Sequence, residues 1–394
     1  MVVRGRVVVK FGGACLSNGE KVRKAAGKVV ESGYKEVVVV VSAMGDTTNR
    51  LIEIMKQIGT VAPEDYPEVV AMGERTSARI FSAALKAQGA DSKYFEPSQD
   101  EWPVITDSNF TDAKPLLEET CRRVKAHLEP LLGKVIPVVC GFLGRDEHGR
   151  VTTLGRGGSD TTALLLANCL KAEEVILVKE TEGVMSADPK IVPDAKPLPK
   201  LDIHEMFTLA YGGAKIVKAE ALKYKLPNQR LRVVRFSNSL KSGGTEIVGV
   251  FNSTTPEVTW KPRLLAVSIV CEMNPKGIGA ILSALGDRPV YGISTGRNSL
   301  TVFTSLGGEE RLLKRLHRLG VCKALSCRGG IGLLEATHPS FIDSPGWVAK
   351  VSGALTSKGI NIIEITTSKA TINVFIDESN LEEAVKAVRR IFEA

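Results

Sequence analysis

Short apolar runs alternate with helical patterns through the first half of the chain. The runs, rich in valine and isoleucine, are residues 6–10, 36–41, 134–140 and 174–178. Apolar residues at consecutive positions predict strands that are buried on both faces, as in a parallel sheet covered by helices. Residues 20–33 have the spacing of a helix between the first two strands. We therefore expect an α/β domain, closed by a β-rich stretch at residues 230–250, with ligands at the carboxyl ends of its strands.

A second pattern follows a polar stretch rich in threonine and proline at residues 252–261. The order strand, helix, strand, strand, helix occurs there twice, at residues 264–272, 277–285, 290–295, 299–304 and 309–319, and at 332–336, 346–358, 360–367, 371–376 and 381–392. This order predicts two ferredoxin-like βαββαβ repeats that share a sheet. Such a tandem favours a regulatory module, with a dimerisation unit that binds no ligand as the alternative. The expected domains are residues 1–255, 256–329 and 330–394.

Composition narrows the class of protein. A chain of 394 residues with 43% hydrophobic and 24% charged residues is typical of two or three globular domains. The low aromatic content of 5% argues against a surface that stacks on nucleic-acid bases. The net charge of +8 suits anionic ligands such as nucleotides, but a solvated basic surface gives the same count.

Cysteine usage and hydropathy concern the compartment. The seven cysteines are scattered without a CxxC pair, which predicts reduced thiols in the cytoplasm. The start of the chain carries no signal-like segment, and no apolar stretch approaches the roughly 20 residues of a membrane helix. We expect a soluble, cytoplasmic protein.

The first strand runs directly into Lys10 and the glycines Gly12 and Gly13. Glycine lets backbone N–H groups approach a phosphate closely, and a lysine at a strand end supplies a fixed positive charge. The sequence differs from the Walker loop, because the GxxxxGK[ST] pattern is missing here. A tight turn without a ligand would have the same composition.

The strongest local signal is TTLGRGGSDTT at residues 152–162, which leads into an apolar helix. Ser159 would lie at the helix N-terminus, where free N–H groups and the helix dipole favour anions. Arg156 offers a planar fork for a carboxylate. Asp160 could hold Mg²⁺ or orient catalytic lysines. Ser159 and Asp160 as simple helix caps are the structural alternative, which leaves Arg156 and the glycines unexplained.

Five separated motifs occur in an order that is known from one family. They are KFGG at residues 10–13, SAMGDTTN at 42–49, MGE at 72–74, GFLG at 141–144 with TTLGRGGSD at 152–160, and SADPK at 186–190 with AYGGAK at 210–215. The chain resembles the aspartate kinases of the amino acid kinase family over nearly its whole length. The C-terminal repeats resemble the two ACT domains of that family, with SPGWVAK at residues 344–350 similar to the usual ACT turn.

The resemblance implies roles in phosphoryl transfer. Lys10 would contact the transferring phosphate, which Gly12 and Gly13 would line. Asp160 would orient Lys10 and a second lysine, Lys215. Further residues implied for the nucleotide site are Lys179, Glu180, Met185 and Lys190.

The resemblance also implies the substrate and the effector. Glu74 would hold the α-ammonium group of aspartate and Arg156 its α-carboxylate. The substrate pocket would be completed by Ser42, Thr48, Phe142 and Ser159. An amino-acid effector would bind the second repeat at Asp343, Gly346, Thr366 and Thr367.

Several positions depart from the family pattern. The family continues KFGG with Thr-Ser, where this chain has Ala14 and Cys15. The usual WTDVDGVY is VKETEGVM at residues 178–185, and the usual His-Pro after GAKVL is Lys-Ala at residues 218–219. The family places two strands before the first ACT helix, and the single run 264–272 predicts a shortened first repeat.

The implied activity is ATP- and Mg²⁺-dependent phosphorylation of the aspartate side chain to 4-phospho-L-aspartate, the first step toward lysine, threonine and methionine, under amino-acid feedback. No metal ligand among the protein side chains is expected. The chain would form a homo-oligomer through its ACT repeats and bind neither nucleic acid nor membrane. The alternatives are a related kinase with another acceptor and a non-catalytic amino-acid sensor. The pair Glu74 and Arg156 argues against the first of these, and the set Lys10, Asp160 and Lys215 against the second.

Overall fold

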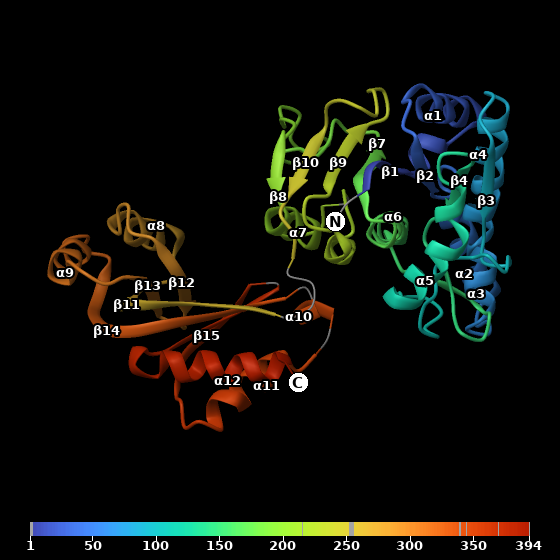
Figure 1. The fold of residues 1–394 in the computed structure, drawn as a ribbon. Coiled ribbons are helices and arrows are strands. Elements are labelled where there is room, and N and C mark those ends of the chain that lie inside the picture. The colour runs from blue at the N-terminus through green and yellow to red at the C-terminus, as the bar shows by residue number, and fades with distance from the viewer. Residues whose placement is uncertain are drawn as a thin grey trace. The chain divides into compact units, whose positions relative to one another are not determined.

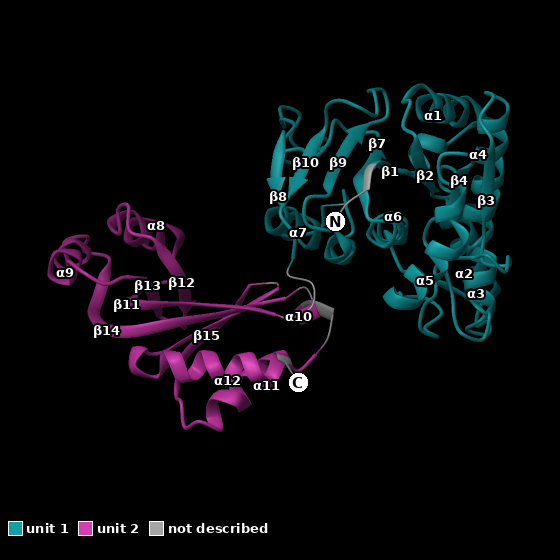
Figure 2. Ribbon diagram, in the orientation of Figure 1, with its two compact units in different colours: residues 1–251 teal, residues 252–394 magenta. Residues whose placement is uncertain are grey.

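The computed structural model divides the chain into two compact units, Met1–Phe251 and Asn252–Ala394 (Figures 1 and 2). The structure describes residues 3–214, 216–251, 256–338, 340–343, 345–368 and 370–393, without the side chains of residues 3, 4, 342, 343 and 393. Each unit has its own sheet and core, and the two are considered separately below.

Unit 1 is built on an eight-stranded sheet with the order β3-β4-β2-β1-β7-β9-β10-β8. Its strands are β1 (Val3–Phe11), β2 (Glu36–Val41), β3 (Ser92–Phe95), β4 (Ile136–Cys140), β7 (Ala172–Lys179), β8 (Lys200–Asp202), β9 (Arg230–Arg235) and β10 (Thr245–Val248). Every pair is parallel except β9 and β10. A separate hairpin joins β5 (Leu143–Arg145) to β6 (Val151–Thr153). The predicted parallel sheet is confirmed.

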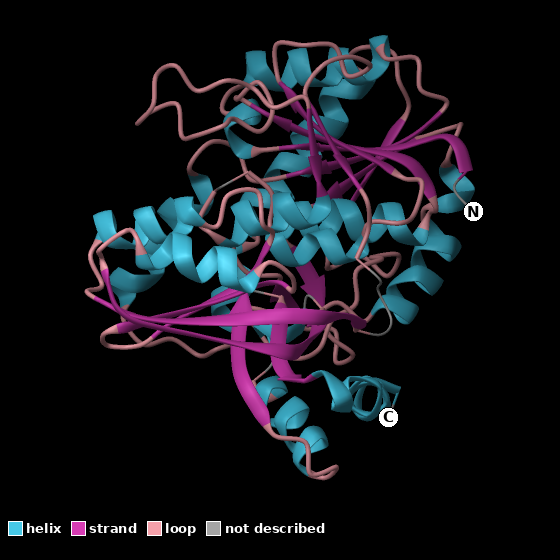
Figure 3. Cartoon of the chain, turned by 90° about the vertical axis from the view of Figure 1, so that its left-hand side faces the viewer, coloured by secondary structure: helices cyan, strands magenta, loops and turns pink. Residues whose placement is uncertain are grey.

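Helices cover this sheet on both sides (Figure 3). They are α1 (Gly19–Glu31), α2 (Thr47–Ile58), α3 (Asp65–Val70), α4 (Met72–Lys86), α5 (Leu117–His127), α6 (Gly158–Cys169) and α7 (Ile203–Tyr211), with 3₁₀ turns η1 (Gly13–Leu16), η2 (Glu129–Leu131) and η3 (Ala219–Tyr224). Because α6 packs against β1, β2 and β7, nearly all of its side chains are buried. No helix in the described ranges is both long and apolar enough to cross a membrane.

Unit 2 contains a six-stranded antiparallel sheet with the order β12-β13-β11-β14-β16-β15. The strands are β11 (Glu257–Cys271), β12 (Val290–Thr295), β13 (Ser299–Ser305), β14 (Cys322–Thr337), β15 (Ile362–Ser368) and β16 (Thr371–Asp377). The helices are α8 (Pro275–Ala284), α9 (Glu309–His317), α10 (Ser340–Asp343), α11 (Trp347–Thr356) and α12 (Leu381–Glu393), with the 3₁₀ turn η4 (Glu378–Asn380).

The long strands β11 and β14 belong to both repeats. The C-terminal part of β11 pairs with β13 and with the start of β14, as in the pair Val267 and Cys327. The N-terminal part of β11 pairs with the end of β14, which in turn pairs with β16. Each repeat therefore has four strands and two long helices. The expectation of a shortened first repeat is wrong, because one 15-residue strand supplies both repeats.

Each repeat of unit 2 buries a core of its own. In the first, Val267, Ile269 and Val302 pack against α8 and α9, and in the second, Leu334 and Val374 pack against α11 and α12. A third cluster joins the two halves through Phe303 of β13 and Phe375 of β16, whose stacked rings lie 3.7 Å apart between centroids.

The structure also corrects the prediction that all cysteines are free thiols. Cys121 of α5 and Cys169 of α6 form a disulfide, with 4.6 Å between their Cα atoms. The two residues are 48 positions apart, and their pairing depends on the packing of α5 against α6, which the sequence pattern did not show. The other five cysteines are free.

Candidate active site

Lys10 and Asp160 form a buried ion pair where the carboxyl ends of β1, β2 and β7 meet. The Lys10 Nζ atom lies 2.7 Å from Oδ1 of Asp160, and both side chains are at most 6% exposed. Burial alone would raise the pKa of Asp160, but the ammonium groups of Lys10 and Lys179 outweigh it and hold the pKa below its usual range. Asp160 is therefore charged at neutral pH and holds the Lys10 side chain at the strand ends.

The glycines after Lys10 bring two loops into backbone contact. The N–H of Gly12 donates to Val178 O at 3.3 Å, and that of Gly45 to Gly13 O at 2.9 Å. A Cβ on Gly13 would lie only 2.6 Å from Ala43 O, so no larger residue fits without movement of the backbone. Backbone contacts thus hold the loop that follows β1 against the loop that follows β2, with backbone N–H groups close to Lys10.

Glu74, in the first turn of α4, is a buried carboxylate with one free oxygen. Its Oε1 accepts the N–H of Ala43 at 3.0 Å, whereas its Oε2 is buried and has no hydrogen-bond partner among the described residues. Burial raises the pKa of Glu74 to about 7, although the Ala43 N–H and the nearby Thr48 side chain oppose the rise. Gly73 permits this position, because a Cβ there would lie 2.7 Å from the Ala43 Cβ. An ammonium group would satisfy the free oxygen.

Ser42, Phe142 and Ser159 line the same strand ends. The Ser42 hydroxyl donates to Ser159 Oγ at 3.0 Å and so links the end of β2 to the start of α6. Phe142, two residues after the end of β4, has a φ of 69°, a conformation that a bulky side chain adopts rarely and mostly at functional sites. Its N–H donates to Thr162 Oγ1 of α6 at 3.1 Å, which holds that conformation. Thr162 was not predicted from the sequence.

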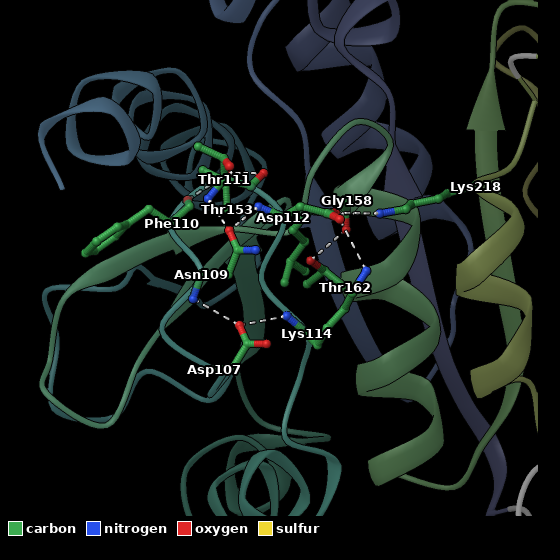
Figure 4. A network of polar contacts seen from close by, with 11 residues as sticks. Asp107, Asn109, Phe110, Thr111, Asp112, Lys114, Thr153, Gly158, Thr162 and Lys218 are labelled. Atoms are coloured by element: carbon green, nitrogen blue, oxygen red, sulfur yellow. Dashed lines mark hydrogen bonds and ion pairs between the residues drawn. The ribbon is translucent and has the colours of Figure 1, made fainter. Parts of the chain in front are cut away.

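A network of hydrogen bonds holds the loop that carries Arg156 (Figure 4). Lys218 donates to Leu154 O at 2.8 Å and lies 3.9 Å from Oδ1 of Asp112. Thr153 contacts Phe110 O through both its N–H and its hydroxyl. Arg156 itself is exposed on this loop. Lys218, seen in the sequence only as a departure from the family pattern, therefore connects the segment that begins at residue 216 to the loop that carries Arg156.

The residues that were predicted to bind the nucleotide come together only in part. Lys179, at the end of β7, lies 3.3 Å from Oδ2 of Asp160. Glu180 is exposed and pairs with Lys21 at 2.7 Å. Further along the chain, Met185 bridges to Pro197 and Lys190 is exposed on the loop before β8. Lys215, the predicted second lysine, lies outside the described residues. Of the two predicted lysine partners of Asp160, the structure thus describes Lys10, and it adds Lys179.

The effector candidates lie in unit 2. Gly346 precedes α11 with a φ of 93°, and Thr366 and Thr367 are on the edge strand β15. Asn373 Nδ2 donates to Thr366 Oγ1 at 3.4 Å, while the Oδ1 atom of Asn373 is buried without a partner in the described part of the chain. The side chain of Asp343 lies outside the described residues.

The site fits the phosphates of a nucleotide better than it fits a protein-bound metal. Two glycines and two lysines at the strand ends offer N–H groups and positive charge. Within the described ranges, no group of three or more His, Cys, Asp and Glu side chains could hold a metal ion.

Comparison with known proteins gives two family matches. Residues 5–234 match the amino acid kinase family, and residues 330–390 match the ACT domain. The aspartokinase of Corynebacterium glutamicum is 32% identical over 98% of this chain and 96% of its own. The aspartate kinase Ask_LysC of Stutzerimonas stutzeri is 30% identical over 98% of this chain and 97% of its own.

Solved structures agree in fold. The crystal structure of aspartate kinase from Synechocystis superimposes with a TM-score of 0.72 at 25% identity, over 99% of this chain and 70% of that one. Aspartokinase III of E. coli, in complex with aspartate and ADP, gives a TM-score of 0.58 at 20% identity, over 99% of this chain and all of that one.

Proposed function

Because the chain belongs to the amino acid kinase family, we propose that it is an aspartate kinase, which transfers the γ-phosphoryl group of ATP to the side-chain carboxylate of L-aspartate. The observation that carries the choice of an amino-acid acceptor is the free Oε2 atom of Glu74. A buried carboxylate oxygen without a partner needs a cation, and the α-ammonium group of aspartate supplies one. The named relatives are aspartate kinases, which supports the same acceptor.

Acceptor binding follows from the residues around Glu74. Arg156 would bind the α-carboxylate of aspartate through its planar guanidinium fork. Thr48, Phe142 and Ser159 would complete the pocket. With both α-groups held, the side-chain carboxylate would face the phosphoryl group beside Lys10.

Phosphoryl transfer needs positioning and charge neutralisation more than proton transfer. The side-chain carboxylate of aspartate has a pKa near 3.9, so it is already a nucleophile at neutral pH and no general base is required. A carboxylate oxygen forms a bond to the γ-phosphorus as the bond to the bridging oxygen of ADP breaks. The products are ADP and 4-phospho-L-aspartate. Lys10, held by Asp160, would neutralise charge on the phosphoryl oxygens.

Mg²⁺ would enter with the nucleotide. Bound to ATP, it neutralises part of the phosphate charge. Because the described residues provide no cluster of metal ligands, the phosphate oxygens and water would supply its coordination.

A test of acceptor choice uses the full chain with ATP, Mg²⁺ and hydroxylamine, which converts an acyl phosphate to a hydroxamate. Aspartate, glutamate and N-acetylaspartate are compared at equal concentration. We expect hydroxamate with aspartate, and at least tenfold less with N-acetylaspartate, which lacks the ammonium group that Glu74 binds. Equal rates with aspartate and N-acetylaspartate would contradict the role of Glu74.

Regulation would reside in the second repeat, which matches the ACT domain. E. coli aspartokinase III has been crystallised with lysine and aspartate in a T-state. We propose that an amino-acid end product binds this chain near Gly346 and Thr366 and shifts it between two states.

Two measurements on the full chain test this proposal, namely activity and calorimetric titration with lysine, threonine and methionine. Without binding or inhibition at millimolar concentration, the feedback proposal fails and the kinase proposal stands. Assembly into a homo-oligomer and a cytoplasmic location stay predictions.

A further inference from the structure

Lys179 shares the carboxylate of Asp160 with Lys10. It is the last residue of β7, which is the parallel neighbour of β1. The Lys179 Nζ atom lies 3.3 Å from Oδ2 and 3.4 Å from Oδ1 of Asp160, while the Lys10 Nζ atom lies 2.7 Å from Oδ1. A single carboxylate therefore holds two ammonium groups at the strand ends.

This cluster has an excess of positive charge. Two ammonium groups and one carboxylate leave one net positive charge, and the Lys10, Lys179 and Asp160 side chains are 6%, 20% and 5% exposed. The acids that follow Lys179 do not balance it, because Glu180 pairs with Lys21 and Glu182 pairs with Arg235. Burial lowers the pKa of Lys179 to about 8, with Lys10 contributing and Asp160 opposing. A partly buried charge of this kind is costly unless an anion completes it.

We propose that Lys179 is a catalytic residue of the phosphoryl transfer, which contacts the γ-phosphoryl oxygens of ATP beside Lys10. The proposal rests on the proposed kinase function and adds a residue to it. The position is the second of the WTDVDGVY pattern, where the family has threonine. A lysine there brings an ammonium group to within reach of the phosphate that Lys10 binds. Lys179 stays protonated throughout and neutralises charge as the bond to ADP breaks.

A purely structural ion pair is the competing explanation, and two substitutions separate the two. Lys179→Met removes the charge and keeps the length of the side chain. Lys179→Arg keeps the charge at every accessible pH. Lys24→Met is the matched control, since Lys24 is an exposed lysine on α1 that pairs only with Glu20 in the described part of the chain.

The experiment measures kcat and KM for ATP and aspartate, with melting temperatures, on the full-length variants. We expect Lys179→Met to lose kcat by at least about a hundredfold, with KM for aspartate changed less than about threefold. Lys24→Met should match the wild type. A kcat of Lys179→Met within about threefold of the wild type would overturn the proposal.

The dependence of kcat/KM for ATP on pH gives a second measurement. A lysine with a purely structural role would have no effect on this dependence. Because kcat/KM reports the free enzyme, kcat/KM for ATP should fall above about pH 8 as Lys179 loses its proton. In Lys179→Arg this fall should disappear. A fall that persists unchanged in Lys179→Arg contradicts the proposal, even where Lys179→Met fails to fold.

Nucleotide binding separates failure of this proposal from failure of the kinase assignment. If the wild type phosphorylates no aspartate, the assignment fails. Calorimetric titration with a non-hydrolysable ATP analogue and with ADP then still tests whether Lys179 contacts the γ-phosphate. Lys179→Met should weaken binding of the analogue at least about tenfold more than binding of ADP. If the substitution weakened binding of the analogue and of ADP equally, Lys179 would not contact the γ-phosphate.

Discussion

The ammonium group of Lys10 lies 2.7 Å from the carboxylate of Asp160, in a site where both side chains are almost fully buried. The pair joins the end of β1 to the first turn of α6. It therefore connects the loop that would bind phosphate to the helix that carries Ser159.

Lys10→Ala should abolish turnover and leave the fold intact. The glycines, rather than the Lys10 side chain, determine the backbone contact with the neighbouring loop. We expect a loss of at least about a hundredfold in kcat, on the scale of roughly 2.7–4 kcal/mol for a preorganised donor. Steady-state kinetics and circular dichroism provide the measurement. A variant with more than half of the wild-type kcat would remove Lys10 from the mechanism.

Glu74 predicts a dependence of aspartate binding on pH. Its pKa is raised to about 7, so below pH 7 the free enzyme carries a neutral Glu74 that attracts an ammonium group poorly. The value of kcat/KM for aspartate should fall about tenfold per pH unit as the pH drops below 7.

Glu74→Gln should remove the fall of kcat/KM for aspartate below pH 7. The same variant should lower kcat/KM for aspartate by roughly a hundredfold at pH 8, because a hydrogen bond between charged groups is lost. If kcat/KM for aspartate still fell below pH 7 in Glu74→Gln, a group other than Glu74 would be the one that titrates.

Arg156→Lys should raise KM for aspartate by at least about tenfold and change KM for ATP much less. Lysine keeps the charge of arginine but cannot present two parallel N–H groups to a carboxylate. Arg122→Lys, at an exposed position on α5, is the matched control. A rise in KM for ATP instead would place Arg156 on the nucleotide side.

The disulfide between Cys121 and Cys169 should stabilise unit 1. Closing a loop across 48 residues contributes on the order of 4 kcal/mol in the chain-entropy model. We expect Cys121→Ser to lower the melting temperature by on the order of 10 °C, and Cys327→Ser, at a free cysteine, to lower it far less. Thiol counting on the unfolded, unreduced protein should find five free cysteines. Seven free thiols would show that the bond does not form.

The sequence predicted the elements whose patterns are local. Runs of valine specified β1 and β2, and the βαββαβ order of the C-terminal half appears in the structure, although β11 begins at Glu257 instead of residue 264 and β14 at Cys322 instead of residue 332. Lys10 and Asp160 were found because glycine and charge cluster beside a strand end and a helix start, whereas Glu74 was found through the resemblance of residues 72–74 to a family motif.

Features that depend on packing between distant segments were missed. The sharing of β11 between the repeats requires pairing partners that lie about 70 residues away, such as Trp260 and Leu334. The Cys121–Cys169 bond depends on the contact of α5 with α6. The contact of Lys179 with Asp160 depends on α6 crossing the ends of β1 and β7. None of these leaves a periodic signal along the chain.

The most direct test of the kinase assignment identifies the product of the full-length protein incubated with ATP, Mg²⁺ and L-aspartate. Borohydride reduces an acyl phosphate to an alcohol, so phosphorylation of the side-chain carboxylate yields homoserine, whereas phosphorylation of the α-carboxylate yields 3-amino-4-hydroxybutanoate. We predict ADP and homoserine in equal amounts by mass spectrometry, and neither from the Lys10→Ala variant. ADP release without homoserine would contradict the assignment.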